Sequence, residues 1–189
     1  MSEGWNRRVV MVLLACLLAA GTAAADVLID CPTAGGSAAD RHNRGFYVPQ
    51  YPGTTLDLVA LRMFPSVLDT YTVRLTARAD TYDGTLLGQS EVTVPFTDGA
   101  PQEVVFTFPA VPVTQNGVVT FAIEQLAGDG VIYYDVTPQD PASCPVVQTQ
   151  DTTPPLSSFR RDGIVVRIEG TSGVAAERRS WSMLKAAYR

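Results

Sequence analysis

The sequence predicts an all-β domain, an antiparallel β-sandwich that is jelly-roll-like and has about nine strands. Between Asp26 and Gly170 the chain consists of short runs of β-branched and aromatic residues, separated by Gly, Pro, Asp and Asn. Several runs alternate apolar and polar residues, which is typical of strands that bury one face and expose the other. From Leu56 up to the C-terminal end, no stretch has a helical period.

The N-terminal end has the layout of a secretory signal peptide. Arg7 and Arg8 precede an apolar run over residues 9–20, and Ala23-Ala24-Ala25 matches the small-residue cleavage pattern. We therefore expect a signal helix over residues 1–25 and a mature chain that begins at Asp26. The protein is then secreted or held at the cell surface, with the periplasm as a further destination.

Two alternatives would attach the chain to a membrane. The apolar segment from Val9 to Ala25 nearly reaches the length of a spanning helix, so it could remain as an anchor. Leu13-Leu14-Ala15-Cys16 loosely resembles a bacterial lipobox, which would place a lipid on Cys16. Membrane contact is expected only through such an uncleaved or lipidated N-terminus.

The remaining chain predicts one domain, over residues 26–170, and a tail over residues 171–189. About 165 residues are a usual size for a single hydrophobic core. Asp-Gly and Asn-Gly pairs between the runs supply residues that accept positive φ in turns. The predicted strands are Val27–Asp30, Phe46–Val48, Leu56–Met63, Tyr71–Ala79, Gly88–Val94, Glu103–Phe108, Val118–Glu124, Val131–Val136 and Ile164–Glu169.

The last predicted strand follows a stiff connector at Pro154 and Pro155. Ile164, Val166 and Ile168 alternate with Val165, Arg167 and Glu169, as expected for a strand with one buried face. We expect this strand to return to the sandwich, so that the connector is a loop within the domain.

Charge limits the classes of partner. The chain has a formal net charge of −5, and its acidic residues dominate between Asp26 and Gln150. Nucleic acid binding requires a basic face that neutralises phosphates, so nucleic acid is not an expected partner. A cell-surface protein or a glycan remains as a candidate partner.

The mature chain retains two cysteines, Cys31 and Cys144, because Cys16 leaves with the signal peptide. An even number in an exported protein predicts a disulfide, which would close a loop of more than a hundred residues. Two independent thiols or two metal ligands are the alternative, although His42 is the only histidine available to complete a zinc site.

The core-strand patterns resemble those of secreted bacterial jelly-roll modules of poorly defined function. This resemblance implies a sandwich over most of residues 26–170, and it transfers no site residues. The last nine residues, Trp181 to Arg189, are similar to short tails on exported bacterial proteins. The patterns that carry the first resemblance are Leu56–Met63, Gly84–Gly88, Val105–Phe108, Ile132–Asp135 and Val166–Gly170.

The sequence indicates no catalytic machinery. His42 stands alone, and neither a G-x-S-x-G nor an H-E-x-x-H motif occurs. Most carboxylates lie at turn positions, where Asp is favoured for backbone reasons. We therefore expect a protein that is not an enzyme.

A carbohydrate-binding site would use exposed aromatic rings as platforms. No tryptophan lies within residues 26–170, so tyrosines are the main candidates. Tyr133 and Tyr134 are adjacent in a strand and must point to opposite faces. The candidate glycan contacts are Tyr47, Tyr51, Tyr82, Tyr133 and Tyr134.

No cofactor is expected, and a calcium ion is the one candidate considered. Asp80, Asp83, Asp129 and Asp135 are hard oxygen ligands that could line a loop site outside the cell. Asp-Gly turns explain Asp83 and Asp129 without an ion.

The tail is basic and amphipathic, with Trp181, Leu184 and Tyr188 at helical spacing. It is interpreted as a disordered end, an interaction helix or a surface-retention signal. Taken together, the sequence predicts a non-catalytic exported structural, adhesive or binding module. The alternative is a carbohydrate-binding module, with calcium as a potential stabiliser.

Overall fold

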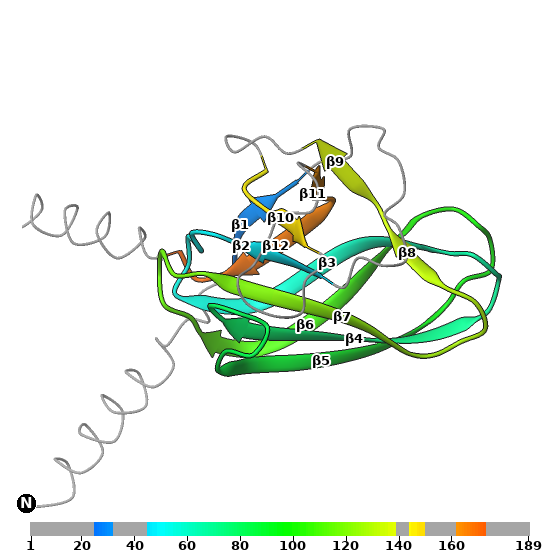
Figure 1. Ribbon diagram of the computed structural model, residues 1–189, viewed down its shortest axis with the longest axis horizontal. Coiled ribbons are helices and arrows are strands. Elements are labelled where there is room, and N and C mark those ends of the chain that lie inside the picture. Colours follow the sequence, from blue (N-terminus) through cyan, green and yellow to red (C-terminus); the bar gives the residue numbers. More distant parts are fainter. Residues whose placement is uncertain (1–24, 32–44, 139–143, 150–161, 173–189) are drawn as a thin grey trace, which may run out of the picture.

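The computed structural model describes residues 25–31, 45–138, 144–149 and 162–172 (Figure 1). The predicted signal peptide up to residue 24, His42, the Pro154–Pro155 connector and the predicted tail from residue 173 lie outside these ranges. Within them, no helix is long and apolar enough to cross a membrane.

The described residues form antiparallel β-sheets, as the sequence predicts. The strands are β1 (Asp26–Asp30), β2 (Gly45–Val48), β3 (Thr55–Pro65), β4 (Thr70–Ala79), β5 (Leu86–Pro95), β6 (Gln102–Pro112), β7 (Val119–Ala127), β8 (Ile132–Tyr134), β9 (Val136–Pro138), β10 (Val147–Thr149), β11 (Asp162–Ile164) and β12 (Val166–Gly170).

Two sheets pack face to face in a sandwich (Figure 1). The first sheet has the order β1-β12-β3-β6, and β8 also pairs with β3. The second sheet has the order β10-β2-β7-β4-β5, and β9 and β11 form a separate small ladder. The predicted return of the last strand is confirmed, because β12 lies between β1 and β3.

The described residues contain twelve strands where the sequence predicts about nine, because β10 is not among the predicted strands and because the chain changes partners at two positions. Tyr134 still pairs with β3, whereas Val136 pairs with Ile164 of β11. Asp135, between them, donates its backbone N–H to the Arg62 carbonyl and accepts from the backbone N–H of Val165. Two predicted strands are therefore each divided in two, at Asp135 and at Val165.

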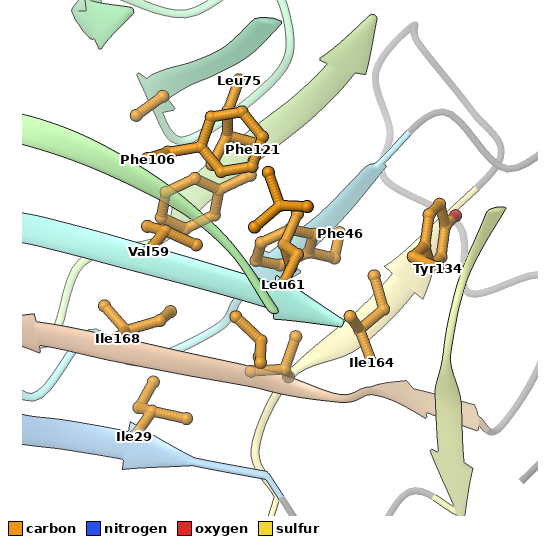
Figure 2. Packing of buried hydrophobic residues seen from close by; sticks show 14 of the residues in the cluster. Ile29, Phe46, Val59, Leu61, Leu75, Phe106, Phe121, Tyr134, Ile164 and Ile168 are labelled. Carbon is orange, nitrogen blue, oxygen red and sulfur yellow. The ribbon is translucent and has the colours of Figure 1, made fainter. Parts of the chain in front are cut away.

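The space between the sheets is filled by apolar side chains from both inner faces (Figure 2). Phe46 and Phe121 of the second sheet stack with their ring centroids 4.7 Å apart. Val59 and Phe106 come from the first sheet, and all four side chains are fully buried. Each such side chain stabilises the fold by about 1.5–3 kcal/mol through burial.

A disulfide joins Cys31, directly after β1, to Cys144, shortly before β10. Their Cα atoms are 5.0 Å apart, and 113 positions separate them in the sequence. The predicted pairing is confirmed, and the alternative of independent thiols or metal ligands is wrong. Because β1 belongs to the first sheet and β10 to the second, the bond links the two sheets covalently.

Removal of this disulfide should destabilise the domain strongly. A loop of this length is expected to contribute up to about 5 kcal/mol by restricting the unfolded chain. We expect the double variant Cys31→Ser/Cys144→Ser to lose a large part of that stability. Urea unfolding of the variant and of the oxidised and reduced parent measures it; equal midpoints for all three would contradict this prediction.

Candidate functional site

Three of the five candidate tyrosines are buried and offer no ring face to a ligand in solution. Tyr51, Tyr82 and Tyr134 have 0%, 7% and 4% of their surface exposed. Tyr51 donates its hydroxyl to the Thr55 carbonyl, and burial, together with the charge of Asp57, raises its pKa. Tyr134 points into the interior (Figure 2), where its hydroxyl accepts from the Gln148 amide. Because they are buried, these three tyrosines cannot serve as stacking platforms, which corrects the prediction.

Tyr133 lies on the outer face of the first sheet, next to an aromatic partner. Its ring stacks on Phe64 of β3, with centroids 5.3 Å apart and an interplanar angle of 22°. The two residues are direct cross-strand neighbours and both are half-buried. Phe64 is not among the predicted candidates, although it follows Ala60 and Arg62 at the two-residue spacing of one strand face. We call Phe64 and Tyr133 the aromatic pair.

Tyr47 has a different environment. It lies on β2 of the second sheet, where it pairs with Val147 and Thr120 and is half-buried. Its neighbour Phe46 faces the core, so Tyr47 points outward, and the aromatic ring contacts found in the described residues do not include it. The structure therefore places Tyr47 and Tyr133 on opposite outer faces of the sandwich.

A groove of about 410 Å³ lies on the same outer face as the aromatic pair. Ala60, a small residue of β3 that is 2% exposed, lies between longer side chains and leaves the space open. We call this space the outer groove. Its lining residues are Asp30, Cys31, Ala60, Arg62, Glu103, Val165, Val166 and Arg167.

Two arginines in the outer groove are held by carboxylates. Arg167 of β12 donates to Glu103 of β6 (2.9 Å) and also contacts Glu169. The hydrogen bond to Glu103 raises the pKa of Arg167. Arg62 of β3 pairs with Asp135 (3.1 Å). These partly exposed pairs contribute little to stability, but they fix donors and acceptors in defined positions.

The aromatic pair and the two ion pairs form one continuous strip. Phe64 and Arg62 are two residues apart on the same face of β3, a separation of about 7 Å along an extended strand. Ala60, one step further, pairs with Arg167 of the neighbouring strand. The strip therefore changes from apolar, at the aromatic pair, to polar, at Arg62 and Arg167.

The structure does not bring the four calcium candidates together. Asp80 and Asp83 lie in the turn between β4 and β5, whereas Asp129 lies in the β7–β8 connection beside Asp69, at the start of β4. Asp135 is engaged by Arg62 on the first sheet. No group of three or more His, Cys, Asp or Glu side chains in the described residues could hold a metal ion.

The interaction residues of the predicted tail, Trp181, Leu184 and Tyr188, lie outside the described residues. No protein-family model matches this chain, and no curated protein matches it. The candidate site therefore depends on the geometry of the outer groove and the aromatic pair alone.

The contributions of two carboxylates to the stability of the fold should change with pH in opposite directions. Burial raises the pKa of Asp135 above 3.8, although the charge of Arg62 partly offsets this. Hydrogen bonds from the backbone N–H groups of Asp129 and Thr70 lower the pKa of Asp69 below 3.8. The stability contributed by Asp135 is thus fully present at low pH and is lost as the pH rises through its folded-state pKa. The stability contributed by Asp69 is present above pH 3.8 and is lost as the pH falls through its folded-state pKa.

As the pH rises from about 3 to about 7, we expect the free energy of unfolding of Asp135→Asn to increase relative to that of the parent. Over the same rise in pH, the free energy of unfolding of Asp69→Asn should decrease relative to that of the parent. Thermal unfolding midpoints at several pH values test both, with each variant as the control for the other. Parallel trends in the two variants would contradict the assignment.

Proposed function

We propose that this chain is an exported, non-catalytic binding module that takes its ligand in the outer groove. The observation that carries the proposal is the position of the aromatic pair beside that groove. A surface with fixed polar groups and an adjacent apolar platform is the usual composition of a ligand site.

The strand order supports a jelly-roll fold for the module. If β8, β9, β10 and β11 are set aside, the first sheet reads β1-β12-β3-β6 and the second reads β2-β7-β4-β5. Eight antiparallel strands that the chain distributes over two sheets in this way match the double Greek key of a jelly roll. In such sandwiches function resides in sites on the faces and loops, so the fold alone gives no activity.

The disulfide and the N-terminal sequence support export. A buried disulfide persists in oxidising compartments and is rare in the reducing cytosol. Cleavage after Ala25 would release Asp26, which is the first residue of β1. Secretion, or exposure at the cell surface, is therefore the proposed destination.

Sheet edges favour ligand binding over assembly by strand addition. The edges of β5 and β6 are close together, since the Thr107 backbone N–H donates to the Ser90 hydroxyl (3.1 Å). Among the other edge strands of these two sheets, β1 has 5 residues and a register shift, and β8 and β10 have 3 residues each. Short or irregular edges are poor templates for another chain.

Filling the outer groove should weaken binding. Ala60→Leu adds a larger side chain between Arg62 and Arg167, so ligand contact with both should be blocked. Ala122→Leu is the matched control, because Ala122 has the equivalent outward position on β7 of the second sheet. The probe is isolated bacterial cell envelopes, and the readout is co-sedimentation of the mature chain, residues 26–189.

We expect saturable binding that Ala60→Leu weakens by at least about tenfold, while Ala122→Leu leaves it unchanged. Thermal unfolding verifies that both variants fold. Equal binding by the parent and a folded Ala60→Leu variant would overturn the proposal, and so would an equal loss in both variants.

A further inference from the structure

The outer groove has features that discriminate between classes of ligand. We propose that its ligand is a neutral glycan, with one sugar ring stacked on the aromatic pair and its hydroxyl groups bound by the Arg62–Asp135 and Arg167–Glu103 pairs. This inference rests on the proposed function and names the ligand class of the same site.

The aromatic pair provides the apolar part of the site. Phe64 and Tyr133 are cross-strand neighbours whose rings stack on one another, so each ring fixes the orientation of the other. The face of an aromatic ring carries partial negative charge and attracts the slightly positive C–H groups on the flat face of a pyranose. Half-buried rings that already pack together lose little conformational entropy when a ligand adds to the stack.

The ion pairs provide the polar part. A sugar hydroxyl both donates and accepts, so it fits best between a guanidinium, which only donates, and a carboxylate, which only accepts. Two such guanidinium–carboxylate pairs are present: Arg62 with Asp135 at 3.1 Å, and Arg167 with Glu103 at 2.9 Å. Charged partners make such hydrogen bonds stronger than neutral ones.

The balance of charge favours a neutral ligand. Two guanidinium groups, those of Arg62 and Arg167, are accompanied by the carboxylates of Asp30, Glu103, Asp135 and Glu169. Both arginines are already bound to carboxylates, and the negative groups outnumber them. An acidic polysaccharide or a phosphate group would have to displace these partners and would be repelled by the remaining carboxylates.

The length of the strip favours more than one sugar ring. Phe64, Arg62 and Ala60 lie on one face of β3 at steps of about 7 Å, so the strip extends about 14 Å from the aromatic pair to Arg167. A ligand that contacts both ends must be longer than a single pyranose. We therefore expect oligosaccharides to bind more tightly than the corresponding monosaccharide.

Affinity electrophoresis of the mature chain tests this inference directly. The neutral probes are β-glucan, xylan, galactan and mannan; the acidic probes are alginate, polygalacturonate and hyaluronan. We expect at least one neutral polysaccharide to retard the protein and none of the acidic ones to do so. Titration calorimetry with the matching oligosaccharide series then gives the dependence of affinity on chain length.

Substitutions at the two outward tyrosines locate the contact. Tyr133→Ala should weaken binding by about tenfold or more, as expected for the loss of an aromatic anchor. Tyr133→Phe keeps the ring and should stay within about twofold of the parent, a difference well below that of a lost anchor. Tyr47→Ala, on the other outer face, is the matched control and should bind as the parent does.

The outcomes separate this inference from the proposed function. Binding only to acidic polysaccharides or only to envelope protein, with loss in Ala60→Leu, would overturn the neutral glycan and leave the outer groove as the binding site. Glycan binding that is lost in Tyr47→Ala but not in Tyr133→Ala would overturn both. Retardation by a neutral glycan with loss in Tyr133→Ala and rescue in Tyr133→Phe supports both.

Discussion

The insertion of β12 between β1 and β3 is the constraint on which the rest of the structure depends. This strand is next to the end of the described chain, yet its neighbours are the first strand and the third. Val166 and Ile168 complete the core on one face, while Arg167 and Glu169 reach the outer face. The core, the first sheet and the outer groove are therefore completed by the same five residues.

Much of the fold could be predicted because the controlling signals are local. The alternation in Tyr71–Ala79 identifies a strand with one buried face, and Val104, Phe106 and Phe108 do the same for β6. The disulfide was predictable from the even number of cysteines that follow the predicted signal peptide. The short strands β9, β10 and β11 were harder to predict, since three-residue ladders depend on where the neighbouring chain lies and carry little pattern of their own.

The candidate site could be predicted only in part, because sequence patterns assign residues to faces and not to neighbours. Tyr133 was identifiable as an aromatic on a strand, but its contact with Phe64 requires the register between β3 and β8. The Arg167–Glu103 pair spans 64 positions and bridges two strands across a third. Tyr51 and Tyr82 are poor candidates for a related reason: both lie in connections between strands, so strand periodicity does not report their burial.

The position of β12 also governs when the groove comes into existence. Pairings between distant segments are costly in chain entropy and form slowly. A chain that has not yet released its C-terminal part has β3 and β6 but lacks Arg167, and its first sheet is open in the middle. The outer groove is consequently complete only in the finished molecule, once β12 has paired with both β1 and β3. A chain that ends before Val165 would lack three of the residues that line this groove, Val165, Val166 and Arg167.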